Sequence, residues 1–427
     1  MRPYQVLIFI AAVIAVLGTL YMAFPEEAVE TPEIAELADF RDTVIPEYRD
    51  TVLRDTIPSE PEEPARPVIP TVAVDTMTDS RQFLASFYAS LAESGERVVR
   101  VLHYGDSQIE EDRMTQQIRE ALQARYGGSG VGLMPLAQTI PTRTVKQQLH
   151  MNGRMISPSQ GPRRYLVYGP KRDQRKDGRY GVMGQMAVMN DSLVGGSEEL
   201  MAVCSPQDGK NGYERWQIFA DSTITYTTTE DTVYLTGRGA VYGLSQESNT
   251  GVIVDNIPMR GCLGLVFTKM DSAQLASFYR EQNVRLIIMQ FGGNAIPFNE
   301  TPSTIQAIVR GLREQVRYLH HLAPEASILF IGPSDMLRQM DGEWQTYPMV
   351  PYMDRLLRKM ALEEHIAYYS LYRMMGGAGS MKRWQEAGLA GSDGIHFMRS
   401  GARKAGNAVA NWLMEPMKEG VKEGVTE

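Results

Sequence analysis

A serine stands at a sharp turn between an apolar run and a helical pattern. Residues 97–105 are typical of a buried strand, the turn reads Gly105-Asp106-Ser107, and residues 109–128 carry apolar side chains at helical spacing. A serine at the start of a helix has its backbone N–H at the positive end of the helix dipole, which stabilises a developing oxyanion. Ser107 is therefore a candidate nucleophile. The alternative is that Asp106 or Ser107 only caps the helix.

A histidine and an aspartate lie three residues apart near the C-terminus. Asp393 and His396 belong to "SDGIHFMRSGARKAG", a loop that leads into the last predicted helix. A histidine that acts as a general base needs an acceptor on its second ring nitrogen, which fixes the tautomer and stabilises the imidazolium. The Asp-x-x-His turn can supply that acceptor. His396 is therefore a candidate general base, with Asp393 as the residue that orients it.

Two further positions offer hydrogen-bond donors. Gly261, in "VDNIPMRGCLG", presents an unobstructed backbone N–H, and Asn294, in "MQFGGNAIP", follows two glycines at the end of the most apolar strand. With the backbone N–H of Ser107 they predict an oxyanion hole, the set of donors that holds the negative oxygen of a tetrahedral intermediate. Taken singly, Gly261 also fits an ordinary turn glycine, and Asn294 fits an Asx-turn residue.

The elements that would position these residues alternate along the chain. Apolar strands are expected at 284–293, 326–335 and 366–372, and amphipathic helices separate them. This alternation is typical of an α/β protein with a doubly wound parallel sheet flanked by helices. Open α/β sheets place their sites at the carboxyl ends of the strands, so we expect the candidate residues to meet at that edge.

A different pattern interrupts the alternation between about residues 135 and 244. Short runs such as "RYLVYG", "STITYTTT" and "TVYLTG" are separated by turn residues, which is typical of an antiparallel β-sandwich or jelly roll. We therefore expect a discontinuous α/β domain at 79–134 and 245–418, with an inserted β-rich module at 135–244. Trp216 and the tyrosines near it are candidates for stacking on sugar rings, or else core aromatics of the sandwich.

The first 24 residues predict a membrane anchor. Residues 4–24 are 21 residues without a charge, and as a helix they would span about 30 Å, the thickness of a bilayer core. Arg2 before the run and "PEEAVE" after it put the N-terminus in the cytoplasm and the bulk of the protein outside. A cleaved signal peptide is the alternative. Either interpretation predicts export, to the periplasm or another extracytoplasmic location at the inner membrane.

Residues 25–78 differ again in composition. The part from 26 to 66 holds 13 acidic residues against four arginines, with prolines throughout. Such a segment buries too little apolar surface to offset its chain entropy, so it predicts a disordered tether. Its acidic excess is larger than the net charge of −8 of the whole chain, and the remainder is therefore close to neutral.

The composition argues against several function classes. A chain with a net charge of −8 and no basic stripe is not expected to bind nucleic acid. With six histidines and no cluster at ligand spacing, no metal or other cofactor is expected. His103, inside the first strand, is expected to be a core histidine. The two cysteines, Cys204 and Cys262, either pair in an oxidising compartment or stay buried thiols.

In the order Ser, Gly, Asn and Asp-x-x-His, the candidate residues resemble the four blocks of the SGNH (GDSL-type) hydrolase superfamily. The match covers about residues 98–134 and 250–415. Within that superfamily the chain looks most like bacterial peptidoglycan O-acetylesterases, on "YGDSQIEEDRMT", "GVIVDNIPMRG", "MQFGGNAIP" and "MMGGAGSMKRWQEAGLAGSDGIHF". Those relatives also carry a carbohydrate-binding-like β module after the first block. Two positions depart from the pattern of the superfamily. Ala295 follows Asn294 where many relatives have an acidic residue, and Ala402 follows Gly401 where an aromatic residue is common. Neither change removes a catalytic group, so both concern fine specificity.

The resemblance implies an exported serine esterase that removes O-acetyl groups from peptidoglycan or another cell-wall glycan. It implies a triad of Ser107, Asp393 and His396, an oxyanion hole of Ser107, Gly261 and Asn294, and no cofactor. Two alternatives stay open. One is an O-acetyltransferase that acts on a cell-surface polysaccharide with the same triad, and the other is a non-catalytic wall-binding scaffold. The intact set of five residues argues against the scaffold.

Overall fold

The computed structural model describes residues 69–70, 72, 79–136, 138, 140–156, 163–166, 182–189, 199–206, 212–340 and 342–415. The predicted membrane span at 4–24 and nearly all of the predicted tether at 25–78 lie outside these residues. Within the described ranges, no helix is both long and apolar enough to cross a membrane. The anchor and the tether therefore stay predictions.

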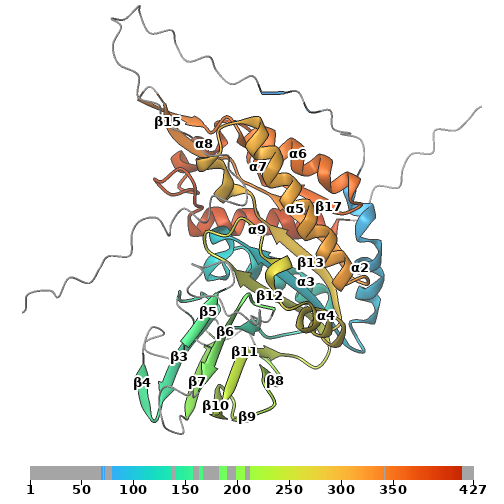
Figure 1. Cartoon of the computed structure of the whole chain (residues 1–427), viewed down its shortest axis with the longest axis vertical. Helices are drawn as coiled ribbons and strands as arrows, with labels where there is room; N and C mark the ends of the chain where they lie inside the picture. The colour runs from blue at the N-terminus through green and yellow to red at the C-terminus, as the bar shows by residue number, and fades with distance from the viewer. Residues whose placement is uncertain are drawn as a thin grey trace, which may run out of the picture. The chain divides into compact units, whose positions relative to one another are not determined.

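A five-stranded parallel sheet forms the centre of the α/β part (Figure 1). Its strand order is β12-β1-β13-β14-β17, and each neighbouring pair runs parallel. The strands are β1 (Val98–Gly105), β12 (Gly251–Pro258), β13 (Val284–Gln290), β14 (Ser327–Gly332) and β17 (Ala367–Ser370). All six residues of β14 are buried, as expected for a parallel strand that is covered on both faces.

Helices cover both faces of this sheet. Side chains of β1 alternate between two cores, with Leu102 and Tyr104 in one and Val99 and Val101 in the other. Helices α4 (Ser272–Glu281), α5 (Pro302–Leu322) and α6 (Val350–Glu363) close the first core. The second core is closed by η2 (Ser80–Leu84), α2 (Ala85–Ser90), α3 (Thr115–Tyr126), α7 (Leu371–Met375), α8 (Ser380–Glu386) and α9 (Arg399–Met414). The prediction of a parallel sheet flanked by helices is confirmed.

Short elements fill the connections. The 3₁₀ helices are η3 (Leu91–Glu93), η4 (Ser107–Asp112), η6 (Phe267–Lys269) and η7 (Gly293–Phe298). Strands β15 (Leu337–Met340) and β16 (Glu343–Thr346) form an antiparallel pair after β14. Two of these elements, η4 and η7, directly follow strands of the parallel sheet, so they begin at the edge where the candidate residues were expected.

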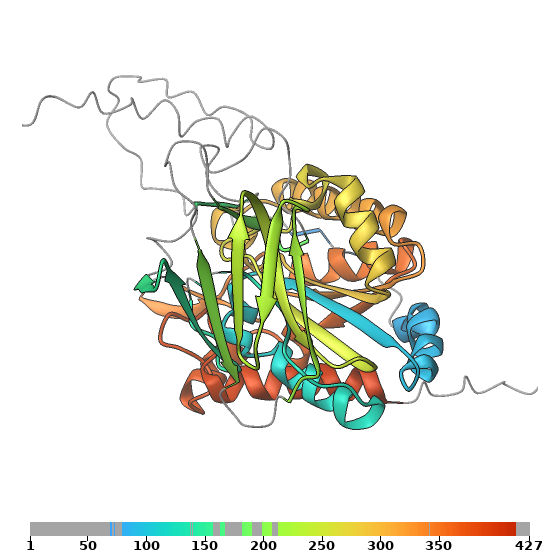
Figure 2. The same cartoon turned by 90° about the horizontal axis from the view of Figure 1, so that it is seen from below.

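Two antiparallel sheets make up the inserted part. One has the order β4-β3-β7-β10-β9, and the other has the order β2-β11-β6-β5 with β8 also pairing β11. The strands are β2 (Gly132–Met134), β3 (Val145–Met151), β4 (Arg154–Ile156), β5 (Arg163–Leu166), β6 (Gln185–Met189), β7 (Leu200–Pro206), β8 (Arg215–Ala220), β9 (Ile224–Thr228), β10 (Thr232–Gly237) and β11 (Gly239–Glu247). Figure 2 shows several of these strands, in green, running side by side.

The two sheets share one apolar core, which is the arrangement of a β-sandwich. Val145 and Leu200 from the first sheet and Val241 and Leu244 from the second belong to the same buried cluster. Strand β2 and the last residues of β11 lie outside the range 135–244 that the sequence suggested for the module. These residues pair with each other, so the second sheet extends past both expected boundaries.

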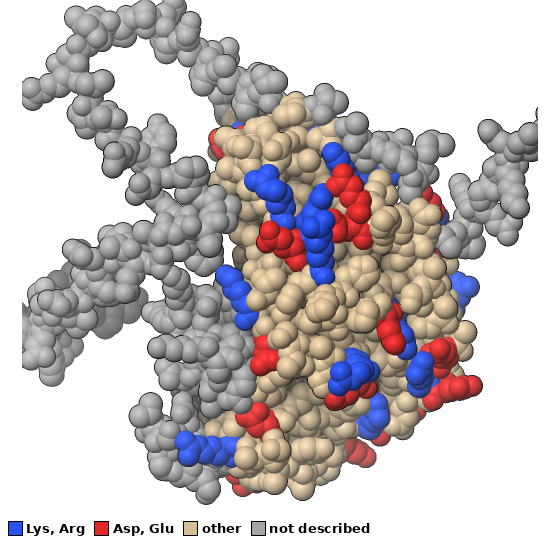
Figure 3. All heavy atoms as spheres, turned by 45° about the vertical axis from the view of Figure 1, so that its right-hand side comes forward, with Lys and Arg blue, Asp and Glu red and all other residues tan. Residues whose placement is uncertain are grey.

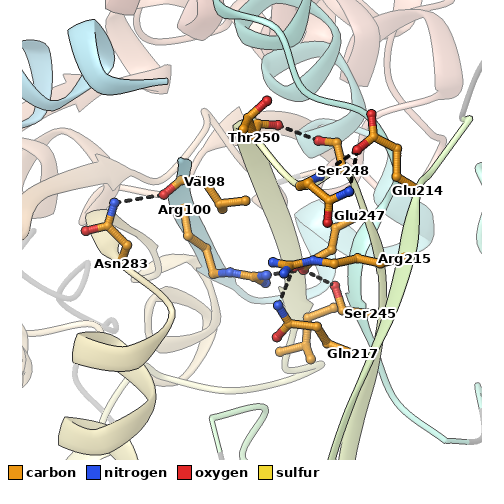
Figure 4. A network of polar contacts seen from close by, with 12 residues as sticks. Val98, Arg100, Glu214, Arg215, Gln217, Ser245, Glu247, Ser248, Thr250 and Asn283 are labelled. Carbon is orange, nitrogen blue, oxygen red and sulfur yellow. Dashed lines mark hydrogen bonds and ion pairs between the residues drawn. The ribbon is translucent and has the colours of Figure 1, made fainter. Parts of the chain in front are cut away.

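A buried charge cluster joins this sandwich to the parallel sheet (Figure 4). The fully buried Arg100 of β1 pairs with Glu247 at the end of β11 and, at 2.9 Å, with Asp255 of β12. Glu247 also accepts hydrogen bonds from Arg215 at 2.7 Å and Gln217 at 2.6 Å, both on β8. Burial opposes the ionisation of Glu247, but Arg100 and the other donors hold its pKa below the usual value.

Candidate active site

The predicted site residues meet at the carboxyl ends of the central strands. Ser107 follows β1, Gly261 follows β12, Asn294 follows β13, and His396 lies in the loop before α9. All four line one cleft with a volume of about 650 Å³. Asp393 contacts His396 from within the same loop. The structure therefore brings all five residues together.

Ser107, His396 and Asp393 form a chain of hydrogen bonds. The Oγ atom of Ser107 lies 2.9 Å from Nε2 of His396, and Nδ1 of His396 lies 2.7 Å from Oδ2 of Asp393. A neutral imidazole that donates from Nδ1 to the carboxylate has an acceptor at Nε2 for the proton of the serine. This is the geometry of a Ser-His-Asp triad.

The loop itself keeps Asp393 ionised. Oδ1 of Asp393 accepts hydrogen bonds from the backbone N–H groups of Ile395 at 2.9 Å and His396 at 3.0 Å. Partial burial acts to raise the pKa of Asp393. The hydrogen bonds from the ring and backbone of His396 and from the backbone of Ile395 outweigh it and lower the pKa below its usual value. A carboxylate is thus ready to stabilise an imidazolium.

The serine turn differs from the expected start of a long helix. Residues Ser107–Asp112 form the short helix η4, in which Glu110 is extended and Glu111 and Asp112 have φ of 59° and 62°. Helix α3 begins only at Thr115. The prediction that the long helix begins directly after the turn is wrong, because three acidic side chains of η4 pair with arginines and hold the chain in a turn. The dipole of α3 therefore does not act on Ser107.

Asp106, and not Ser107, caps this turn. Its Oδ1 accepts a hydrogen bond from the backbone N–H of Gln108 at 3.0 Å, which leaves the hydroxyl of Ser107 to His396. Burial raises the pKa of Asp106 to about 6. Asp106 therefore caps the turn, and Ser107 stays a candidate nucleophile.

Two backbone N–H groups of the cleft are available to an oxyanion. Within the part of the chain that the structure describes, no acceptor is found for the N–H of Ser107 or of Gly261. Gly261 has φ of 72°, and a Cβ atom added there would meet nothing within 4 Å. The backbone conformation, rather than the space around it, therefore favours glycine at this position.

Asn294 reaches the same cleft with a fixed side chain. Its Nδ2 donates to Oδ2 of Asp106 at 3.2 Å and to the backbone oxygen of Cys262 at 3.1 Å. Both amide hydrogens thus have protein acceptors. An oxyanion bound here would accept one of these hydrogens together with its present acceptor, in a three-centre hydrogen bond.

Among known proteins, no family model and no curated protein matches this sequence. The fold, however, is similar to a solved structure of a peptidoglycan O-acetylesterase. The match has a TM-score of 0.61 at 20% identity and covers 79% of this chain and 95% of that one. This match shows that the two proteins share a fold.

Two partial matches have lower scores. An acetyl xylan esterase matches at 11% identity, over 38% of this chain and 79% of its own, with a TM-score of 0.27. The periplasmic domain of the Salmonella ser. Paratyphi A lipopolysaccharide acetyltransferase matches at 12% identity, over 39% of this chain and 72% of its own, with a TM-score of 0.26.

Three further side chains organise the cleft. Nε2 of Gln108 donates to the backbone oxygen of Ile395 at 2.7 Å, which ties the serine turn to the residue before His396. Glu110 is almost fully buried and accepts two hydrogen bonds of 2.8 Å from Arg260, which precedes Gly261. The sequence did not indicate these three residues, because neither a glutamine beside a serine nor an arginine beside a glycine has a distinctive spacing.

The other residues singled out from the sequence lie outside the cleft. His103 is a core histidine as predicted, with Nε2 3.1 Å from Gln290 and Nδ1 2.9 Å from Thr115, and burial lowers its pKa to about 4. Cys204 and Cys262 are buried free thiols. Across the described ranges, no group of three or more His, Cys, Asp or Glu residues is arranged to hold a metal ion.

Proposed function

We propose that this protein is a serine esterase of the SGNH type that removes O-acetyl groups from a cell-wall glycan. The observation that carries the proposal is the hydrogen-bonded chain Ser107–His396–Asp393, 2.9 Å and 2.7 Å long, in a cleft with two N–H groups for which no acceptor is found among the described residues. A capping serine does not need a histidine at its hydroxyl, nor a carboxylate behind that histidine.

The distances between the triad residues support the following acylation step. Oγ of Ser107 attacks the carbonyl carbon of the acetyl ester while Nε2 of His396 takes the hydroxyl proton. The carbonyl oxygen becomes an oxyanion, held by the N–H groups of Ser107 and Gly261 and by the amide of Asn294. Collapse of the tetrahedral intermediate breaks the ester bond. The sugar oxygen leaves with the proton from His396, and the acetyl group stays on Ser107.

Deacylation repeats these steps with water. His396 removes a proton from a water molecule, which attacks the acetyl carbon, and a second oxyanion forms in the same hole. Collapse expels Oγ of Ser107, which recovers its proton from His396, and acetate leaves. Asp393 stays ionised throughout and stabilises the imidazolium in both halves of the reaction.

Two features favour a glycan as the substrate. The cleft of about 650 Å³ has Phe298 in its lining, and this ring is 85% exposed, as a stacking surface for a sugar would be. The solved structure that matches 79% of this chain carries the name of a peptidoglycan O-acetylesterase. An anchor at 4–24 and a tether at 25–78 would hold the esterase in the periplasm, within reach of the wall.

The proposed role of the sandwich is to hold the polymer. Trp216 alone is weak support for this role, because its ring already has contacts within the protein. It is only partly exposed, its Nε1 donates to the backbone oxygen of Thr229 at 3.0 Å, and its ring packs edge-on against Tyr213.

The test is acetate release from O-acetylated peptidoglycan by the wild-type chain and by Ser107→Ala. We expect the substitution to lower the rate by roughly 10⁴-fold or more, because the nucleophile of a triad acts as a unit with its base. Ser277→Ala, at a partly exposed position of α4 away from the cleft lining, is the matched control and should keep the wild-type rate. Equal release by Ser107→Ala and the wild type would refute the proposal.

A further inference from the structure

A second cavity lies beside the catalytic cleft, and arginines line most of it. Its volume is about 370 Å³, and its lining residues are Arg113, Gln116, Gln117, Glu120, Arg143, Arg399 and Arg403. We call this cavity the arginine pocket. Arg113 lines the catalytic cleft as well, so the two cavities are neighbours that share one side chain.

The pocket carries excess positive charge, because its lining holds four arginines against one carboxylate, that of Glu120. Arg113 and Arg143 both pair with Glu111, at 3.3 Å and 2.7 Å. For Arg399 and Arg403, no ion-pair partner is found among the residues that the structure describes. On the face of the molecule in Figure 3, by contrast, many of the basic side chains lie next to acidic ones.

The stability of α9 does not explain these two arginines. Arg399 and Arg403 are four residues apart on the helix, so their like charges repel. Arg399 is also the first residue of α9, where the helix dipole disfavours a cation, and Met398 before it makes no capping hydrogen bond from its side chain. A bound anion would remove both costs, and local conflicts of this kind are expected at functional sites.

We infer that the arginine pocket binds a carboxylate of the substrate, on a unit next to the acetylated sugar held at Ser107. The inference rests on the proposed function and narrows the substrate to an acidic O-acetylated glycan. Guanidinium groups match a carboxylate with two parallel N–H···O bonds, which gives orientation as well as affinity. The carboxylate belongs either to a peptide on the glycan or to an acidic sugar ring.

The test compares two double variants of the full chain. Arg399→Gln with Arg403→Gln removes two charges from the pocket. Arg125→Gln with Lys404→Gln removes two charges from α3 and α9 at positions outside the pocket lining. Any general effect of net charge therefore appears equally in both variants.

Each variant is assayed on four substrates. O-acetylated peptidoglycan fragments with their peptides and an O-acetylated polyuronate distinguish peptide carboxylates from sugar carboxylates. The same peptidoglycan fragments with every carboxylate converted to an amide lack the anion. A small neutral acetyl ester reports on the triad alone.

We expect the pocket variant to raise KM about tenfold on one of the carboxylate substrates, since loss of a charge-assisted hydrogen bond is worth about that factor. Its kcat should stay close to wild type, and the amidated substrate should show no difference between the variants. The inference is overturned if KM does not change, if the control variant shows the same change, or if hydrolysis of the small ester falls in parallel with that of the glycan.

Failure of the proposed function gives a different pattern. In that case no substrate, including the small ester, is hydrolysed in a way that depends on Ser107. Binding of the carboxylate and amidated fragments to Ser107→Ala, measured by calorimetry, then tests the pocket alone. Tighter binding of the carboxylate form, lost in the pocket variant, supports the inference, and equal binding of the two forms overturns it.

Discussion

The amide of Asn294 has an observed structural role and a proposed catalytic one, and both roles use the same hydrogens. The amide holds Asp106 and the backbone of Cys262, at 3.2 Å and 3.1 Å, and the same amide would donate to the oxyanion. The contact with Asp106 also links it to the cap of the serine turn. The side chain is therefore fixed in place before substrate binds, which is what an oxyanion donor requires, since a mobile donor would have to be ordered during the reaction.

Asn294→Ala should lower kcat by about 10²–10³-fold with little change in KM, because an oxyanion donor acts mainly on the transition state. Steady-state hydrolysis of a small acetyl ester measures both constants. Asn299→Ala, at the end of the same segment, loses a hydrogen bond to the backbone of Ala295 and is a matched control. A kcat of Asn294→Ala within threefold of wild type would mean that the N–H groups of Ser107 and Gly261 suffice.

The five predicted residues could be found from the sequence because each stands in or beside a turn that follows a strand or precedes a helix. Their side chains then meet by the geometry of a parallel sheet. Gln108 and the Glu110–Arg260 pair could not be found in this way. Their positions depend on the left-handed turn at Glu111 and Asp112, whose φ values are set by tertiary ion pairs rather than by local propensity.

His103 connects three elements of the α/β part. It lies on β1 and contacts Thr115 on α3 and Gln290 on β13, and it is fully buried. Burial lowers its pKa from 6.5 to about 4. Between these values the unfolded chain binds a proton that the folded protein does not bind, so the folded state loses stability as the pH falls.

The contribution of His103 to the free energy of unfolding is complete above a pH of about 6.5. It is lost progressively as the pH falls towards about 4, by up to about 3 kcal/mol. His103→Gln should remove this part of the pH dependence, whereas His320→Gln, on an exposed position of α5, should not. Urea unfolding of the two variants and the wild type, at neutral pH and at a pH near the folded-state pKa of His103, measures this difference. Asp106 titrates in the opposite direction over part of this range, and comparison with the variant cancels its effect.

The sequence predicted helices and strands best where apolar residues recur at regular helical or strand spacing. The strands β1, β13, β14 and β17 and the helix α5 lie where the sequence indicated them. The start of α3 was wrong because charged side chains, not apolar ones, shape the turn before it. The boundaries of the sandwich differ from the predicted range of 135–244 because long-range strand pairing sets them. Strand β2 is only three residues long, and its pairing with β11 depends on a partner more than 100 residues away.

The buried cluster around Arg100 makes the sandwich and the parallel sheet interdependent. Arg100 and Glu247 have no exposed side-chain surface, and they come from β1 of the sheet and β11 of the sandwich. A buried ion pair adds little net stability compared with an apolar core, but removal of one partner leaves an uncompensated charge in the interior. Unfolding of either part should therefore destabilise the other.

Glu247→Gln should lower the free energy of unfolding by about 3 kcal/mol, because Asp255 is then the one acidic partner of Arg100 left among the described residues. Helical circular dichroism reports on the α/β part, and the fluorescence of Trp216 in a variant without the other tryptophans reports on the sandwich. Both transitions should shift together. Glu281→Gln, which breaks an exposed pair with Arg280, should shift neither by more than about 0.5 kcal/mol. A shift of only one transition would refute the coupling.

The central claim is that His396 and Asp393 activate the hydroxyl of Ser107. The most direct measurement is the mass of the intact protein, with the modified residue mapped, after reaction with a fluorophosphonate at neutral pH. The account predicts a single adduct on Ser107 that is absent in His396→Ala, since the hydroxyl is a weak nucleophile without its base. A wild-type chain that stays unlabelled, or that is labelled on another serine, would contradict it.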